Sequence, residues 1–450
     1  VVLRQLQPKR TLTPAQLIVL TYIALILAGT LLLYLPFALK SGDYNNLLDA
    51  LFTATSAVCV TGLTVVDTGT FYSSFGHAVI LLLIQIGGLG LITVTTFYAL
   101  LLGKRIGLRE RVVLKQALKS DTLGGVVRLA RAILMITLAT EAIGAALLTA
   151  AFLKYFPADK ALWYGIFHAV SAFCNSGFDI LGQEYYAYSS LIPLQQDKLV
   201  LMIIAVLIVL GGLGFTVILD VLKKKRFDRL SLHSKLVIVS SVVLILFGMV
   251  FFFFTESGTL WGQMGVADRL TNSLFLSVTS RTAGFTTVDI NQAVPATWMV
   301  LILLMFIGAS PAGTGSGIKT TTFAVLFLAA KSRMQAQGDL VVYNRRIDND
   351  TVTRAMTVTV VAIGVLFGGA ILLSLLDPHD IMKLILEVFA GFGTGLSTGI
   401  TPDLEAGAKM VLIFLMFFGR LGPLTLGFAL LERSARKEHI KFPQGNVIIG

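Results

Sequence analysis

Residues 56–64 read SAVCVTGLT, a short apolar run that ends at a glycine, and the chain contains three more segments of this kind. The later copies are SAFCNSGFD at 171–179, TSRTAGFTT at 279–287 and TGLSTGIT at 394–401. Aligned on one glycine each, the four copies are spaced by 115, 107 and 115 residues. A regular spacing of this size predicts four copies of one structural unit. The aligned glycines are Gly62, Gly177, Gly284 and Gly399.

The composition places these units in a membrane. Of the 450 residues, 55% are hydrophobic and 14% are charged, and the mean hydropathy is +0.82. In soluble domains about a quarter of the residues are charged. Runs of roughly 20 apolar residues, enough to cross about 30 Å of hydrocarbon, predict eight transmembrane helices in an all-α membrane protein. The runs lie near 15–36, 75–102, 128–153, 199–222, 233–254, 297–328, 352–376 and 409–431.

Each predicted unit consists of a spanning helix, a short helix and a second spanning helix. About 11 residues separate the start of each short helix from its glycine, which is too few to cross a membrane. We therefore expect each short segment to enter from outside and turn back, so that four re-entrant pore loops surround one pore. The predicted units are 11–102, 120–226, 231–331 and 350–433, followed by a tail at 434–450.

A glycine at the turn indicates what the re-entrant segments do. Backbone without helical hydrogen bonds is tolerated at membrane depth only where protein or water covers it. Four such segments around one axis would direct carbonyl oxygens at a dehydrated cation, and glycine provides the positive φ and the close approach that this requires. The partially negative C-terminal ends of the short helices favour a cation at the same point. The predicted cation filter comprises Val60, Thr61, Gly62, Asn175, Ser176, Gly177, Thr282, Ala283, Gly284, Ser397, Thr398 and Gly399.

The stretch GASPAGTGSGIKTTT at 308–322 interrupts the second span of the third unit. Four glycines and a proline cannot hold a straight helix, so we expect the span to break there. In the fourth unit, Arg420 lies in FGRLG at 418–422, at the depth of IGGLG at 86–90. A charge at this depth is costly unless it faces water or a partner. Arg420 therefore either faces the pore, where it would donate to loop carbonyls, or pairs with a carboxylate of a neighbouring span.

These features resemble the Trk/Ktr/HKT superfamily of potassium transporters over essentially the whole chain. The fourfold pattern carries the single-glycine filters VTGL, NSGF, TAGF and STGI, and the length and eight spans are most similar to KtrB-type membrane subunits. The resemblance implies potassium uptake through a channel-like pore, with K+ as the transported ion and Na+ as a possible activator. It also implies a homodimer and a KtrA-like, nucleotide-binding cytosolic RCK ring that gates the pore.

The same resemblance implies that the broken span forms an intramembrane gating loop under the filter. Lys319 either anchors this loop or extends toward the membrane surface. The implied gate comprises Gly308, Ala309, Ser310, Pro311, Ala312, Gly313, Thr314, Gly315, Ser316, Gly317, Lys319 and Arg420.

Basic residues indicate the orientation. They gather in the N-terminal arm, the C-terminal tail and the segments 103–131, 223–235 and 331–354. The positive-inside rule places these segments and both termini in the cytoplasm, with the chain in the cytoplasmic membrane. Because topology explains the net charge of +11, nucleic acid is not a predicted partner. The basic amphipathic segments suit anionic membrane lipids or an acidic protein face.

Four further residues bear on the class of function. Cys59 and Cys174 lack metal-binding neighbours in sequence, and the chain has no CxxC, HExxH or GxSxG motif, so neither an enzyme nor an organic cofactor is predicted. Glu141 lies in a predicted span, where we expect it to bond a neighbouring helix. This use disfavours proton coupling, although a sodium- or proton-coupled cation symporter is the alternative function. For Arg281 in the third short helix we expect a structural salt bridge.

Overall fold

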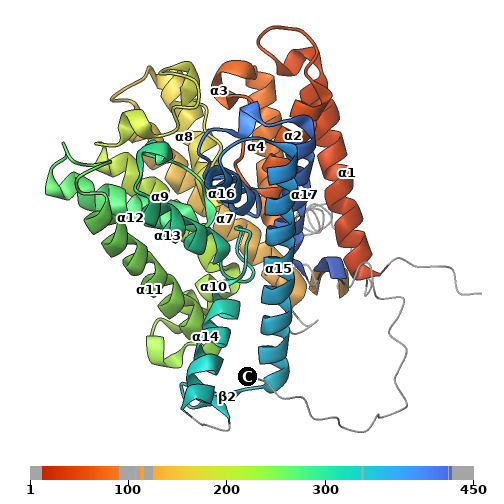
Figure 1. Cartoon of the computed structure of the whole chain (residues 1–450), viewed down its shortest axis with the longest axis vertical. Helices are drawn as coiled ribbons and strands as arrows, with labels where there is room; N and C mark the ends of the chain where they lie inside the picture. Colours follow the sequence, from red (N-terminus) through yellow and green to blue (C-terminus); the bar gives the residue numbers. More distant parts are fainter. Residues whose placement is uncertain are drawn as a thin grey trace, which may run out of the picture.

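The computed structural model describes residues 13–90, 107, 112–115, 125–335, 339–423 and 425–427, and the chain is built mainly from helices (Figure 1). Within these residues, four helices are long and apolar enough to cross a membrane, and each begins a unit of one long helix, one short helix and a second helix. No more than a third of the most apolar window of any of them is buried, so their apolar sides are left to face lipid. They are α1 (Pro14–Tyr34), α7 (Val126–Phe152), α11 (Leu232–Thr255) and α15 (Asn349–Leu376).

The ends of these helices follow from local chemistry. Helix α1 starts at Pro14, whose fixed φ suits the first helical position, and Thr13 and Gln16 form a reciprocal capping box in front of it. Helix α11 begins directly after Ser231, whose hydroxyl accepts a hydrogen bond from the amide of Ser234. Polar caps at these positions satisfy amides that lipid would leave unpaired.

A short helix follows in each unit and packs against the long helix of the same unit. The short helices have many fully buried side chains, whereas the long helices are mostly exposed. The short helices therefore form the centre of the molecule and the long helices its rim. The four short helices are α2 (Leu47–Cys59), α8 (Ala158–Phe173), α12 (Val266–Thr282) and α16 (Ile381–Gly391).

A second helix completes each unit and packs against the short helix of another unit. Helix α4 contacts α8, α9 contacts α12, α13 contacts α16, and α17 contacts α2. Because the fourth unit returns to the first, these contacts close a ring of four units around the short helices. The second helices are α4 (Ser74–Leu89), α9 (Lys198–Leu213), α13 (Pro295–Phe306) and α17 (Ala406–Leu421).

The second helices do not run straight through. Helices α4, α9 and α17 each end at a glycine with positive φ, namely Gly90 (81°), Gly214 (91°) and Gly422 (80°). Helix α10 (Phe215–Lys224) continues from α9 at an angle of 95°, so the apolar run predicted to span at 199–222 is bent near its middle. The physical reason is the left-handed backbone at Gly214, which an α-helix cannot contain.

The third unit is interrupted for longer. Helix α13 ends at Phe306 and α14 (Thr320–Met334) begins at Thr320, so the predicted break near 308–319 is confirmed. If the bent pair α9 and α10 counts as one span, the described residues contain five helices or pairs that satisfy length and hydropathy. The predicted count of eight is not reached there, and the second half of the predicted span 75–102 lies outside the described residues.

The lower end of the molecule in Figure 1 carries α14 and a hairpin of β1 (Leu340–Val342) and β2 (Arg345–Ile347). Leu340 pairs with Ile347, and both side chains pack among α11, α14 and α15. Short elements complete the chain at the other connections. They are α3 (Thr68–Phe71), η1 (Pro36–Ala38), η2 (Leu181–Gln183), η3 (Ile192–Leu194), η4 (Phe227–Arg229), η5 (Ile290–Gln292) and η6 (Thr401–Asp403).

Candidate functional site

A ring of four glycines lies where the four short helices end. A Cβ atom on Gly62 would collide with the carbonyl oxygen of Ser176, and one on Gly177 with that of Ala283. The series continues from Gly284 to the carbonyl of Thr394, and from Gly395 back to the carbonyl of Thr61. All four glycines have positive φ, between 73° and 96°. Each unit thus places a glycine against the main-chain oxygen of the next, and the cycle closes only because no side chain intervenes.

The fourth member of this ring is Gly395, so the alignment of Gly399 with the other three glycines is wrong. A Cβ atom on Gly399 would meet nothing within 4 Å. The ring oxygen of this unit belongs to Thr394 rather than Thr398, and Ser397 lies beyond the ring. The sequence offers two glycines four residues apart in TGLSTG at 394–399, and spacing alone could not choose between them.

In the first three units, hydrogen bonds hold the segment around the ring glycine to the end of the short helix. Val60 and Asn175 adopt left-handed backbone directly after their helices, with φ of 56° and 60°. The Ser171 hydroxyl donates to the carbonyl of Phe178, and the Thr279 hydroxyl donates to that of Phe285. In the first unit, the amide of Gly62 donates to the Ser56 hydroxyl. These bonds tie the segment around each glycine to its own helix.

A cavity of about 120 Å³ lies on one side of the ring, lined by the ring glycines and by residues that follow them. An aspartate follows the aligned glycine in each of the four units. Two of these aspartates, Asp67 and Asp179, line the cavity, whereas the other two, Asp289 and Asp403, do not. Asp67 accepts hydrogen bonds from the amides of Thr70 and Tyr188. Burial, and then the charge of Asp67, raise the pKa of Asp179 to about 7. The cavity therefore has a negative wall whose charge changes near neutral pH.

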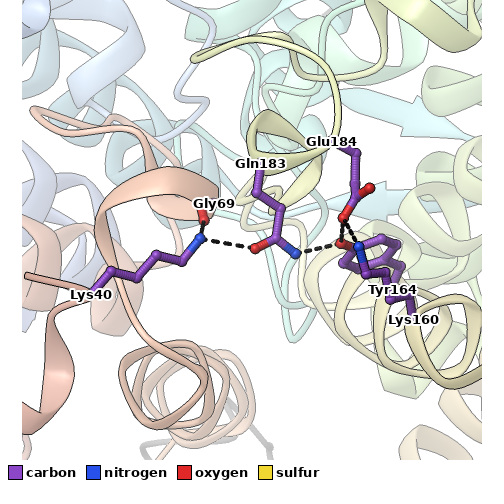
Figure 2. Close-up of polar contacts among 6 residues, drawn as sticks. All are labelled: Lys40, Gly69, Lys160, Tyr164, Gln183 and Glu184. Atoms are coloured by element: carbon purple, nitrogen blue, oxygen red, sulfur yellow. Dashed lines mark hydrogen bonds and ion pairs between the residues drawn. The ribbon is translucent and has the colours of Figure 1, made fainter.

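A polar chain joins the first and second units near this cavity (Figure 2). The Lys40 ammonium donates to the carbonyl of Gly69 at 2.7 Å and to the side chain of Gln183 at 3.0 Å. Gln183 in turn donates to the Tyr164 hydroxyl. The chain ends at Glu184, which accepts from Tyr164 and Lys160, both at 2.7 Å. The loops that carry Asp67 and Asp179 are thereby fixed to each other.

The segment 307–319, hereafter the loop, is a narrow hairpin whose two limbs bond to each other. The amide of Ala309 donates to the carbonyl of Ser316, and that of Ile318 donates to Phe306. The hydroxyls of Ser310 and Thr320 lie 2.9 Å apart. Gly308 lies flat against Ser316 and Gly317, with no space for a side chain. The limbs thus form a stable neck without helical bonds.

The loop contacts the ends of all four short helices, on the side of the ring away from the cavity. The Ser316 hydroxyl donates to the carbonyl of Cys59 at 3.2 Å, and the Thr314 hydroxyl donates to that of Phe173 at 3.0 Å. Gly315 packs against the Thr282 side chain, and Gly393 packs against Ser316. One segment therefore covers this side of the ring and also satisfies carbonyls that the helix ends leave open.

Further bonds fix the tip of the loop to the bend between α9 and α10. The amides of Ser310 and Thr314 donate to the carbonyls of Gly212 and Gly211, and the amide of Phe215 donates to Ala312. Sequence analysis missed the role of Gly211 and Gly212. Gly211 lies against the carbonyl of Phe173, where a side chain would collide. The signal was the motif LGGLG at 210–214, because a helix facing a loop this closely requires small residues.

Arg420 binds main-chain oxygens rather than a carboxylate. Its guanidinium donates to the carbonyl of Thr314 in the loop and to those of Gly87 and Gly88 at the end of α4. In the part of the chain that the structure describes, no acidic side chain lies within ion-pair distance of Arg420. One side chain thus connects the loop to the first and fourth units.

Arg281 corrects the prediction of a salt bridge. Its side chain is 8% exposed, and among residues 13–90, 125–335 and 339–423 it has no carboxylate partner. Its guanidinium instead donates to the carbonyl of Gly308 at 3.4 Å, at the neck of the loop. A main-chain carbonyl that lacks a helical partner can take the place of an acid. Lys319, the last residue of the loop, folds back on it, since its ammonium donates to the carbonyl of Gly315 at 2.7 Å.

Glu141, the two cysteines and Glu387 have structural surroundings in the protein. Gln85 on α4 donates to Glu141 on α7 at 3.0 Å, which is the interhelical bond expected for Glu141. Cys59 and Cys174 are buried and not in a disulfide. Sequence analysis missed Glu387 in α16, which is fully buried and accepts hydrogen bonds from the segment after Gly395. An acidic residue in a short apolar helix was the available signal.

The chain is similar in sequence to known cation transport proteins. The chain matches the TrkH family, described as cation transport proteins, over residues 3–439. It is 37% identical to the Ktr system potassium uptake protein B of Bacillus subtilis, with 97% of each chain covered. It is 38% identical to the potassium/sodium uptake protein NtpJ of Enterococcus hirae, with 98% of each chain covered.

A solved structure shares the fold. The crystal structure of the potassium transporter TrkH from Vibrio parahaemolyticus matches with a TM-score of 0.74 at 20% identity. The match covers 96% of this chain and 88% of that one. Similarity over this length in sequence and in fold agrees with the apolar exposed helices described above. The chain is therefore a multi-pass membrane protein that belongs to the TrkH family of cation transport proteins.

Proposed function

We propose that the chain takes up potassium through the centre of the glycine ring. The observation that carries the proposal is the closed cycle in which each ring glycine meets a carbonyl of the next unit. Four main-chain oxygens, from Thr61, Ser176, Ala283 and Thr394, would replace the water around a dehydrated monovalent cation. The names of the Bacillus and Enterococcus relatives, both potassium uptake proteins, support this choice of ion.

Two other features favour a cation at the ring. The C-terminal ends of four short helices point their partial negative charge toward it. The hydroxyls of Thr61 and Thr394 are buried next to the ring oxygens and have no hydrogen-bond partner among the described residues. Buried hydroxyls are normally paired. An ion at the ring would provide a partner for both oxygens.

In this proposal the loop is the gate and Arg420 holds it closed. The loop contacts all four short helices, so an ion that left the ring on this side would have to displace it. Beyond the loop lies a cavity of about 420 Å³, lined by Lys319, Arg420 and Gly317 among others. Opening would break the bond from Arg420 to Thr314 and join the ring to this cavity.

Charge supports the orientation and the partners. Basic residues occur at the end of α10, namely Lys223, Lys224 and Lys225. The hairpin that follows α14 carries two more, Arg345 and Arg346. The positive-inside rule makes this end cytoplasmic, with both termini on that side and the chain in the cytoplasmic membrane. We propose that the chain forms a homodimer and that a cytosolic RCK ring regulates it from this face. Na+ would act as an activator.

A sodium- or proton-coupled symporter is less well supported. Proton coupling requires an acid on the ion path, and Glu141 is bonded to Gln85 between two helices instead. The Enterococcus relative is named for both potassium and sodium, so sodium remains a second ion to measure.

A matched pair of variants tests the proposed ring. Gly395→Ala and Gly399→Ala both replace a glycine of positive φ, 73° and 88°, so the two share backbone strain of about 1–2 kcal/mol. Only the Cβ at 395 collides with the carbonyl of Thr61. We expect Gly395→Ala to abolish growth of a potassium-uptake-deficient bacterium on limiting potassium, and Gly399→Ala to retain it. Growth with Gly395→Ala at normal expression would contradict the ring.

A further inference from the structure

Glu387 is a fully buried acid in the short helix of the fourth unit. It lies eight residues before the ring glycine Gly395. The equivalent positions of the other units are occupied by Ala54, Ala169 and Leu276, which have no polar group. A buried carboxylate is costly unless hydrogen bonds compensate for lost water, so its presence in one unit of four requires a reason.

Four hydrogen bonds to Glu387 come from one short segment. Its Oε1 accepts from the Ser397 hydroxyl at 2.6 Å and from the amide and hydroxyl of Thr398 at 3.0 and 3.2 Å. Its Oε2 accepts from the Thr401 hydroxyl at 2.7 Å. Asn291, from the third unit, donates to the carbonyl of Thr398 at 2.7 Å and holds the segment from the other side. Bonds to a charged acceptor are stronger than neutral ones.

These bonds decide which glycine reaches the ring. All the donors lie between 397 and 401, on both sides of Gly399. Glu387 bonds this segment to α16, Gly399 lies outside the ring, and Gly395 meets the carbonyl of Thr61. The other units contain one glycine in this region, and there the hydroxyls of Ser56, Ser171 and Thr279 bond to the segment around that glycine.

We propose that Glu387 is a positioning residue that selects Gly395 for the ring and thereby sets the preference for potassium over sodium. The inference rests on the proposed ion path through the ring. If Glu387 is lost, the segment 394–401 is free to shift, and the oxygen of Thr394 leaves the position that matches the other three. A ring with one displaced oxygen discriminates less well between ions of different radius.

The test compares variants in proteoliposomes, with potassium and sodium uptake measured separately. Glu387→Met preserves length but cannot accept hydrogen bonds, and we expect the potassium-to-sodium uptake ratio to fall about tenfold. Glu387→Gln retains an acceptor oxygen and should keep most of the ratio. Ser277→Ala is the matched control, because this buried hydroxyl in α12 donates to Ile245 and not to the ring. It should leave the ratio unchanged.

Hydrogen exchange of the peptide 394–401 gives an independent readout. The amide of Thr398 should exchange faster in Glu387→Met than in Glu387→Gln. If Glu387→Met does not fold, Thr401→Val removes one of the four bonds and should shift ratio and exchange in the same direction. If Glu387→Met folds and its potassium-to-sodium uptake ratio is unchanged, the inference is overturned. If Glu387→Met does not fold, an unchanged ratio in Thr401→Val overturns it. Unselective wild-type protein would instead overturn the proposed function.

Discussion

Replacement of Arg420 by alanine should release the loop and increase potassium flux. The guanidinium donates to the carbonyl of Thr314 in the loop and to those of Gly87 and Gly88, which belong to the fixed end of α4. Only the bond to Thr314 has to break when the loop moves. A hydrogen bond to a charged group contributes about 1.5–3 kcal/mol. Its removal should shift the equilibrium toward the open loop about 10- to 150-fold, because 1.36 kcal/mol corresponds to a factor of ten.

Lysine at the same position separates the hydrogen bonds from the charge. Arg420→Lys keeps the positive charge, but a single ammonium cannot reproduce the fork that reaches both the loop and α4. If Arg420 acts by holding the loop, Arg420→Lys should raise flux toward the level of Arg420→Ala. If the charge alone opposes cations, Arg420→Lys should behave as the wild type.

The assay is uptake of potassium or rubidium into proteoliposomes that contain the purified chain without a regulatory partner. Thermal unfolding of each variant controls for loss of fold. Equal or lower flux in a folded Arg420→Ala protein would refute the proposed role of the arginine, whatever the result for lysine.

Two further predictions concern the neck of the loop and the acidic cavity. Arg281→Met should accelerate hydrogen exchange of the loop amides roughly fivefold, since the bond that it removes is long at 3.4 Å and contributes only about 1 kcal/mol. The melting temperature should not fall, because the replaced charge has no buried acid partner among the described residues. Unchanged exchange would show that the bond to Gly308 does not hold the neck. Acidification of the side that carries Asp179 should lower potassium flux as the pH falls through about 7. Burial and Asp67 raise the pKa of this carboxyl to about 7, and its protonation removes negative charge from the cavity. Asp179→Asn should give low flux that does not vary in this pH range, and a preserved pH response would assign the response to another group.

The break in the third unit and the positive φ of the turn glycines were predicted from the sequence, because each depends on local chemistry. Gly62, Gly177 and Gly284 are the only glycines in their turns, so the spacing alone located them. The choice between Gly395 and Gly399 could not be predicted in the same way. It depends on the bonds to Glu387 and on contact with Thr61, more than 300 residues away.

Charge and hydropathy gave less complete answers. The general rule that buried arginine pairs with an acid predicted a salt bridge for Arg281, but the unpaired carbonyl of Gly308 is its partner. Hydropathy predicted a span at 199–222 but not its bend, because a bend at Gly214 does not change the apolar character of the run. Both differences arise where irregular backbone supplies polar groups inside a membrane protein.

Anomalous diffraction from crystals grown in rubidium tests the ring most directly, because rubidium replaces potassium and reveals its own position. We expect a peak on the central axis, at similar distances from the carbonyl oxygens of Thr61, Ser176, Ala283 and Thr394. No ordered peak at these four oxygens, or a peak only at another site in a protein that transports rubidium, would contradict the proposed path.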